Sequence, residues 1–192
     1  MSNEMAAFFD KLAPAWDNAL LKSGAREKLK SLMVMPPNSM IADVGCGKGV
    51  ILEHLLKTNP QKIFAIDVSG EMIRLAKESF NDDRIEFINS DFYTADLPVL
   101  DAVVFFNSYP HFIDKDGLVD KLAKMVKKDG VVIILHSLSR DEINGCHTGE
   151  KVSTLSVPLE NAEVETVKFN GFFSLESFID NDEIYFIKLV RR

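Results

Sequence analysis

The amino-acid sequence predicts an α/β fold with a doubly wound, mostly parallel sheet of seven strands, two of which form an antiparallel hairpin near the carboxyl terminus. Three observations support this prediction. Short apolar runs alternate with helical patterns across residues 40–136, which is typical of parallel strands joined by crossover helices. A glycine-rich segment, residues 45–49, follows the first of these runs. Two β-rich runs close the chain on either side of Asp180-Asn181-Asp182.

The region after residue 37 is expected to supply five parallel strands, three helices and the hairpin. Apolar runs predict strands buried on both faces, whereas apolar residues three and four apart predict helices. The predicted strands span residues 40–44, 63–67, 85–88, 100–106 and 131–136. The predicted helices span residues 50–56, 70–80 and 118–126, with a weaker helical stretch at 158–169. The hairpin runs, 172–179 and 184–190, are placed at an edge of the sheet.

The segment before Pro36-Pro37-Asn38 has a different, helical pattern. Apolar residues recur at helical spacing near the amino terminus, and a second helix is expected at residues 25–33. Phe8, Phe9 and Trp16 give this segment an aromatic side, which suits either a lid over a ligand or a cap on the core. We therefore expect a single domain, 1–192, in which residues 1–36 form a helical lid and residues 37–192 form the core.

Composition narrows the possible partners and location of the chain. Its 192 residues are 46% hydrophobic, enough for one domain with a sizeable core. The net charge is −7 and the lysines are dispersed, which argues against nucleic acid as a partner. No apolar run approaches the roughly 20 residues that span a bilayer, and no signal-peptide pattern opens the chain. With two distant cysteines, we expect a cytoplasmic protein without a membrane partner; its oligomeric state is left open.

A loop of glycines and the acids that follow it carry the strongest chemical signal. The segment Asp43–Gly49 ends the first predicted strand and opens a helix, where backbone amides can approach an anionic ligand. Asp67 ends the second strand about 20 residues later, the position from which a carboxylate binds ribose hydroxyls in such sheets. Asp91 and Asn107 follow the third and fourth strands. All four polar residues should meet at the carboxyl ends of the strands, as a nucleoside site requires.

These motifs resemble those of the class I S-adenosylmethionine-dependent methyltransferases over residues 38–136, which implies a Rossmann-like fold and that cofactor. In the resemblance the glycine loop holds the methionine portion of the cofactor, Asp67 binds the ribose, and Asp91 with Phe92 binds the adenine. Val68 and Met72 would flank the adenosine. The implied cofactor-binding residues are Asp43, Gly45, Cys46, Gly47, Asp67, Val68, Met72, Asp91, Phe92 and Asn107.

The same fold also occurs in proteins that bind a nicotinamide or flavin dinucleotide, which is the competing interpretation. Its loop requires G-x-G-x-x-G, in which the third glycine packs the helix on the strand. Val50 occupies that third position here, and glycine comes one residue earlier, at Gly49. The dinucleotide pattern also assigns no role to Asp91. The sequence therefore favours the methyltransferase interpretation.

Candidate catalytic residues come after the fourth and fifth strands. A methyl acceptor that carries a proton benefits from a general base, for which histidine is suited. His111 and His147 are the candidate bases, and Arg140 is a candidate anchor for an anionic acceptor. If residues 140–147 are helical, Arg140, Asn144 and His147 share one face, although a solvated loop explains the segment equally well. The histidines lack a recognisable metal-ligand spacing, so no metal is expected.

The predicted function is direct transfer of a methyl group from S-adenosylmethionine to a small-molecule acceptor. Two alternatives remain open. The chain could bind the cofactor or its demethylated product without turnover, or it could methylate protein or RNA. Asn107-Ser108-Tyr109-Pro110 replaces the asparagine-proline-proline-aromatic motif of enzymes that methylate nucleic-acid or glutamine amino groups, which argues against that branch. The sequence does not identify the acceptor.

Overall fold

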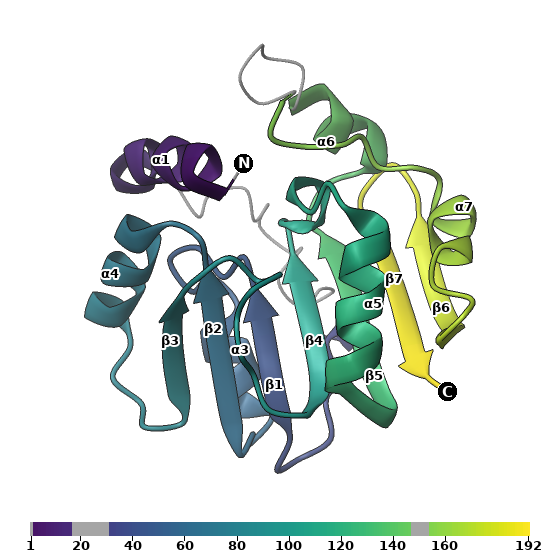
Figure 1. Ribbon diagram of the computed structural model, residues 1–192, viewed down its shortest axis with the longest axis horizontal. Coiled ribbons are helices and arrows are strands. Elements are labelled where there is room, and N and C mark those ends of the chain that lie inside the picture. The colour runs from purple at the N-terminus through teal and green to yellow at the C-terminus, as the bar shows by residue number, and fades with distance from the viewer. Residues whose placement is uncertain (1, 17–30, 147–153) are drawn as a thin grey trace.

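The computed structural model describes residues 2–16, 31–146 and 154–192 and contains a seven-stranded sheet (Figure 1). The strands are β1 Met40–Val44, β2 Lys62–Asp67, β3 Ile85–Asn89, β4 Leu100–Phe106, β5 Val126–His136, β6 Phe173–Asp180 and β7 Tyr185–Arg191. Their order is β3-β2-β1-β4-β5-β7-β6. Strands β1 to β5 pair in parallel, and β7 pairs antiparallel with both β5 and β6. The predicted fold class is confirmed.

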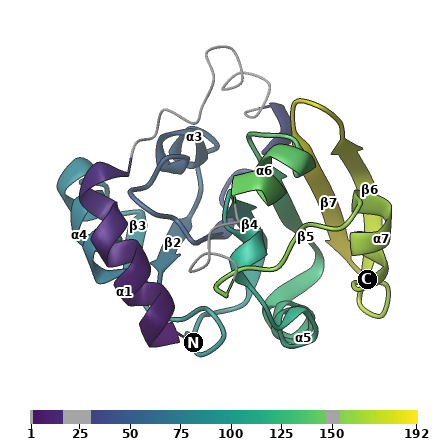
Figure 2. The same ribbon diagram turned by 90° about the horizontal axis from the view of Figure 1, so that it is seen from above.

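Helices cover both faces of the sheet and lie over one of its ends (Figures 1 and 2). The helices are α1 Ser2–Leu12, α3 Leu52–Lys57, α4 Gly70–Ser79, α5 Lys115–Met125, α6 Arg140–Cys146 and α7 Ala162–Val167. One core layer joins α3 and α4 to the sheet, and another joins α5 and α7 to the opposite face. In both views α1 and α6 lie over the carboxyl ends of the parallel strands.

The order of the strands places a crevice beside β1. The chain passes from β1 to β2 and β3 on one side, and β4 then pairs with the other side of β1. The connections leaving β1 and β4 therefore diverge to opposite sides. Ligands of open α/β sheets bind at such a switch point, outside the carboxyl ends of the strands.

Several element boundaries differ from those that the sequence predicts, for local reasons. Helix α5 begins at Lys115 rather than 118 because the Asp114 carboxylate accepts the Gly117 N–H at 2.9 Å and caps it. Strand β5 begins at Val126 rather than 131, because Val126 already pairs with Leu100 of β4, before the register shifts and Val131 pairs with Ala102. Helix α3 begins at Leu52 because tight turns of the glycine loop precede it.

The tail confirms the predicted hairpin and shows how its turn is fixed. The side-chain oxygen of Asn181 accepts the N–H groups of Glu183 and Ile184, each at 3.0 Å, as is typical of an asparagine-centred turn. The helical stretch expected before the hairpin is present as α7. Most of the helix predicted at residues 25–33 lies outside the residues that the structure describes.

A buried polar network ties α7 to the turn after β4. The hydroxyl of Tyr109 donates a 2.5 Å hydrogen bond to Glu165 Oε1, and the Lys168 ammonium lies 2.9 Å from Oε2. Glu165 is 1% exposed and Tyr109 is fully buried. Tyr109 opens the short 3-10 helix η3, Tyr109–His111. The network therefore holds in place the turn that carries His111.

We predict that Glu165→Ala lowers the free energy of unfolding by about 3 kcal/mol, because it leaves the buried Tyr109 hydroxyl and a half-buried ammonium without their acceptor. Glu165→Gln retains an oxygen acceptor for Tyr109 and should lose less. Urea unfolding followed by circular dichroism measures both. The matched control is Glu163→Ala, an exposed position on the same helix, which should change stability by under about 0.5 kcal/mol. Equal losses at 163 and 165 would contradict the role of this network.

Candidate cofactor and active site

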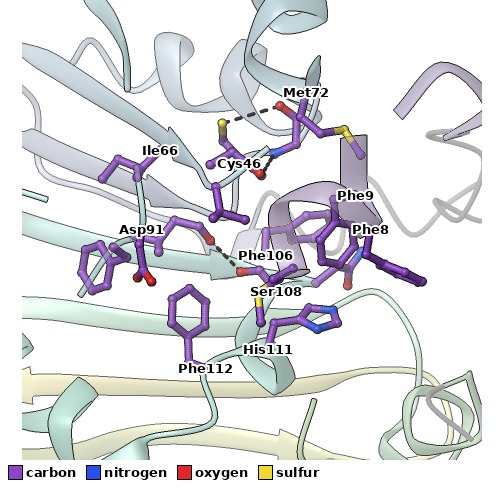
Figure 3. Close-up of a pocket in the computed structure, with 18 of the residues that line it drawn as sticks. Phe8, Phe9, Cys46, Ile66, Met72, Asp91, Phe106, Ser108, His111 and Phe112 are labelled. Atoms are coloured by element: carbon purple, nitrogen blue, oxygen red, sulfur yellow. Dashed lines mark hydrogen bonds between the residues drawn. The ribbon is translucent and has the colours of Figure 1, made fainter. Parts of the chain in front are cut away.

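A cavity of about 690 Å³ lies at the carboxyl ends of β1 to β5, below α1 and α6 (Figure 3). The glycine loop, the ends of β2 to β5 and side chains of α1 and α6 line it. Its volume falls in the range of about 300–1,000 Å³ that is usual for sites of small molecules and cofactors. The cavity includes every residue that the sequence predicted for cofactor binding except Asp43, which is buried in β1 two residues before Gly45.

The glycine loop is held in a shape that side chains would disturb. Gly45 and Gly47 have φ angles of +72° and +53°, in the left-handed region that glycine adopts without strain. Ser108 packs against Gly45 and donates a 2.6 Å hydrogen bond from its Oγ to the carbonyl of Val44. A Cβ on residue 45 would lie 2.5 Å from the Cβ of Ser108. The loop after β1 and the turn after β4 therefore fit together only with glycine at this position.

Asp67 fastens the glycine loop to the start of α4. Its Oδ2 accepts the Gly47 N–H at 2.8 Å, and its Oδ1 accepts the Ser69 N–H at 2.9 Å. Burial raises the pKa of Asp67, and these two N–H groups oppose that effect. A carboxylate has about four acceptor sites, so these two bonds leave acceptor capacity at the cavity that Asp67 lines.

Asp43 is a buried carboxyl that the surrounding protein does not satisfy. It is 1% exposed, and within the described residues no group hydrogen-bonds either of its oxygens. Desolvation, with a smaller contribution from the charge of Asp67, raises the pKa of Asp43 to about 8. Buried acids usually have a partner. A cationic group of a ligand beside the glycine loop would supply one.

The predicted adenine end of the site is formed around Asp91. Its Oδ1 accepts the Tyr93 N–H at 2.9 Å, which orders the turn after β3. The buried ring of Phe92 meets the rings of Phe105 and Phe112 edge to face, at centroid distances of 5.9 and 6.0 Å. Phe92 thus also belongs to the core, which the motif did not indicate. Val68 and Met72 line the same cavity.

Asn107 joins the ends of β4 and β5 at the floor of the cavity. Its Nδ2 donates to Ser137 Oγ, and its Oδ1 accepts the Ser137 N–H, both at 2.9 Å. The backbone of Asn107 is left-handed, with φ of +53°, a conformation that asparagine tolerates better than most residues. The two amide contacts fix the separation of the strand ends. Asn107 therefore contributes to the site both as a lining residue and as a brace.

His111 lies in the cavity at the end opposite Asp91 (Figure 3). Its Nδ1 is 3.0 Å from the carbonyl oxygen of Leu155. Because a carbonyl only accepts, this contact places the proton of a neutral imidazole on Nδ1 and the lone pair on Nε2. The ring also meets Phe9 of α1 edge to face at 5.0 Å. This arrangement suits a general base.

Helix α6 is present, in agreement with one of the two interpretations of its sequence. The face that it turns to the cavity is not the predicted one. Ile143 and Cys146 line the cavity. Asn144 instead binds both backbone groups of Leu159. Arg140 lies outside the lining, with its Nε 3.4 Å from Asp180 Oδ1. The expectation that Arg140 and Asn144 face an acceptor is not met, because partners distant in sequence turn that face away. His147 lies outside the described residues.

Side chains of α1 close one side of the cavity. Met5, Phe8, Phe9 and Leu12 line it together with Trp16, and Phe8 and Phe9 are drawn in Figure 3. The aromatic pattern near the amino terminus therefore belongs to the site. Sequence reasoning did not single out Tyr93, Phe112 or Cys146, which also line the cavity, because no motif or spacing marks them.

Comparisons with known proteins agree with this geometry. A family model described as a methyltransferase domain matches residues 41–130. The malonyl-[acyl-carrier protein] O-methyltransferase of Acetivibrio thermocellus is 38% identical over 94 residues, which are 48% of this chain and 33% of that protein. Residues 41–130 thus match a methyltransferase domain, and the chain is similar over this region to S-adenosylmethionine-dependent methyltransferases. A ribosomal RNA small subunit methyltransferase A of Prochlorococcus marinus is 32% identical over 72 residues, 37% of this chain and 26% of that protein.

The chain thus spans about a third or less of the length of these two relatives. Solved structures resemble it over nearly its whole length. A SAM-dependent methyltransferase from Aquifex aeolicus superposes with a TM-score of 0.73 at 17% identity, covering 97% of this chain and 98% of its own. The N-methyltransferase NodS of Bradyrhizobium japonicum, in complex with S-adenosylhomocysteine, gives 0.66 at 14% identity and covers 91% and 89%. These two likenesses establish the shared fold.

Residues 2–16, 31–146 and 154–192 lack both a metal-binding cluster and a membrane-spanning helix. In that part of the chain no cluster of three His, Cys, Asp or Glu side chains could hold a metal ion. Nor does any helix there combine the length and hydropathy needed to cross a membrane. The similarity to a ribosomal RNA methyltransferase conflicts with the expectation that nucleic acid is not a partner.

We predict that Asp43→Asn stabilises the ligand-free protein at high pH. In the unfolded chain Asp43 ionises near its ordinary pKa of about 3.9, whereas in the fold its pKa is about 8. The folded state therefore binds the extra proton between these values, and the parent loses stability as pH rises through that window. Asparagine at this position does not ionise, so the variant avoids this loss, which above pH 8 reaches roughly 6 kcal/mol at about 1.4 kcal/mol per pKa unit.

Urea unfolding of the parent and Asp43→Asn at pH 5, 7 and 9 measures the difference, which should grow with pH. Asp101→Asn serves as the control, because Asp101 is less buried and its pKa is lowered. A stability difference between parent and Asp43→Asn that is the same at all three pH values would contradict the raised pKa.

Proposed function

We propose that the protein binds S-adenosylmethionine in the cavity and catalyses direct transfer of its methyl group to a small-molecule acceptor. One observation carries the proposal: Asp67, Asp91 and the glycine loop line a single cavity at the switch point of the sheet, and Asp43, a buried carboxyl without a hydrogen-bond partner among the described residues, directly precedes that loop in β1. The match of residues 41–130 to a methyltransferase domain supports the cofactor. When bound, the cofactor supplies a methyl group on a positively charged sulfonium, which an aligned nucleophile can displace.

Each part of that cofactor has a partner of suitable chemistry in the cavity. The unsatisfied Asp43 carboxyl suits the methionine ammonium, which would also favour its ionised form. Asp67, held by two backbone N–H groups, suits the ribose hydroxyls. Asp91 with Phe92 suits the adenine, with Val68 and Met72 flanking it. Gly45, Cys46, Gly47 and Asn107, which are also proposed from the motif, line this space, whereas Asp43 lies buried just before the glycine loop.

The protein's own contribution to transfer is orientation and the handling of one proton. Asn107 and Ser137 fix the ends of β4 and β5, and η3 presents His111 at the far end of the cavity. Holding a nucleophile in line with the methyl group can contribute several kcal/mol. The Nε2 of His111 would accept the proton of a hydroxyl, thiol or amine acceptor. His147 remains a second proposed base, whereas the pairing of Arg140 with Asp180 favours a structural role for Arg140.

The acceptor end favours a small molecule over RNA. Phe8 and Phe9 of α1, together with Trp16 further along the chain, bring apolar surface to the cavity. RNA binding relies on cationic contacts to phosphates and on stacking platforms open to a strand, whereas this chain has a net charge of −7. The two free thiols, Cys46 and Cys146, suit a reducing cytoplasm.

We predict that Asp67→Ala weakens binding of S-adenosylmethionine by at least about 100-fold, because it removes hydrogen bonds to a charged acceptor and releases the glycine loop. Titration calorimetry measures this. Asp120→Ala, at an exposed site on α5, is the control and should bind like the parent. Equal affinity of Asp67→Ala and the parent would refute the cofactor assignment.

The transfer itself is tested with methyl-labelled cofactor incubated with fractionated metabolite extract, and in parallel with total RNA and total protein. We predict label in a low-mass fraction, and a decrease in kcat of about 10²- to 10⁴-fold in His111→Ala, because a general base is lost. Affinity for the cofactor should stay unchanged in that variant.

Three other outcomes would count against the proposal. Label in RNA or protein instead of a small molecule would overturn the acceptor class. Binding without labelled product in any fraction would indicate a protein that only senses the cofactor. Unchanged turnover in His111→Ala would remove the assignment of the base.

A further inference from the structure

The lid helix α1 is joined to the cofactor end of the site by one carboxylate, that of Asp10. The hydroxyl of Ser69 donates a 2.6 Å hydrogen bond to Asp10 Oδ1, and the backbone N–H of Glu71 donates a 3.0 Å bond to the same oxygen. Ser69 is the N-cap of α4. A negative charge at a helix amino terminus is favourable, and these hydrogen bonds lower the pKa of Asp10. The charged carboxylate of Asp10 therefore binds hydrogen-bond donors that the start of α4 already holds in place.

The residues that Asp10 binds belong to the turn that holds the proposed ribose acid. The N–H of Ser69 donates to Asp67 Oδ1, while Asp67 Oδ2 accepts the N–H of Gly47. The Ser69 hydroxyl also accepts the N–H of Met72 at 3.1 Å. A continuous series of hydrogen bonds thus runs from the lid through Ser69 to Asp67 and on to the glycine loop. Movement of Asp10 would therefore change the hydrogen bonds around the proposed cofactor site.

The same turn of α1 reaches the proposed base. Phe9, which precedes Asp10, packs its ring 5.0 Å from His111 and 6.0 Å from Trp16. Figure 3 shows Phe8 and Phe9 projecting from α1 into the cavity on the side of His111. Asp10 and Phe9 therefore connect one short segment to both ends of the site, the ribose turn and the catalytic end.

Building on the proposed function, we infer that Asp10 is a positioning residue that latches α1 over the bound cofactor. Opening the two bonds to Ser69 and Glu71 releases α1, which lets the cofactor in and the demethylated product out. Closing them brings Phe9 against His111 and completes the acceptor end of the cavity. The latch therefore governs how long the product stays bound, and through Phe9 it helps to form the acceptor site.

The test measures dissociation of S-adenosylhomocysteine by stopped flow, with Trp16 as the reporter. Trp16 is the single tryptophan of the chain and lines the cavity, so its emission follows the lid. In Asp10→Ala we expect dissociation at least about tenfold faster, because two hydrogen bonds to a charged acceptor are lost. The Trp16 emission should also shift to the red. The KM for the cofactor should rise more than kcat falls.

Asp10→Asn retains an oxygen that can accept the same two bonds but removes the charge, so its dissociation rate should lie between those of the parent and Asp10→Ala. It also serves if Asp10→Ala fails to fold. Lys11→Ala is the matched control, an exposed neighbour on the same helix, and should release product at the parent's rate.

The latch is overturned if both Asp10 variants release product at the parent's rate, or if Lys11→Ala accelerates release as much as they do. These results differ from failure of the proposed function, in which the parent itself would bind neither S-adenosylmethionine nor its product. Rapid release with unchanged Trp16 emission would likewise refute the role of α1, because product would then leave without displacement of the lid.

Discussion

The carboxylate of Asp67 is the point on which the arrangement of this site depends. It ends β2, accepts an N–H from the glycine loop and another from the N-cap of α4, and reaches α1 through Ser69. The glycine loop, the β2–α4 turn and α1, three parts of the chain that are distant in sequence, are thus connected through one buried carboxyl. The positive φ of Gly47 accompanies this contact, since the loop must turn its N–H toward the acid. Because the donors are backbone groups of structured elements, the fold itself fixes the geometry of the carboxylate.

Burying several acids close together in this way is energetically unfavourable, and a cationic ligand group would relieve it. Burial raises the pKa values of Asp43 and of the Cys46 thiol; the charge of Asp67 adds to the effect on Asp43, and the charges of both acids add to the effect on Cys46. Asp67 has N–H partners, but Asp43 has none within the described residues. A protein selected for stability alone would place an apolar or paired residue there. Strain of this kind typically marks a functional site, and it points to a cationic ligand group beside the glycine loop.

The sequence predicted which residues meet in the proposed cofactor-binding half of the site, because their positions follow from the local pattern of each strand. Each acid directly follows an apolar strand, so the period of the pattern places Asp43, Asp67, Asp91 and Asn107 at one edge of the sheet. The face of α6 could not be predicted in the same way. Asn144 pairs with the backbone of Leu159, and Arg140 with Asp180, and such long-range pairings leave no periodic trace. For the same reason, the sequence did not predict the contact of Asp10 with the start of α4.

The part of the chain that the relatives share with this protein determines what they can reveal about its methyl acceptor. The family model matches residues 41–130, which run from β1 into β5 and contain the proposed cofactor-binding half of the site with η3. The acceptor half adds α1, α6 and the segment around Leu155, which lie outside that range. Segments over the carboxyl ends of a sheet can change while the sheet persists. The acceptors named for the relatives therefore do not transfer with the shared domain, and the substrate of this chain has to be sought in the contacts of Phe9, His111 and Ile143.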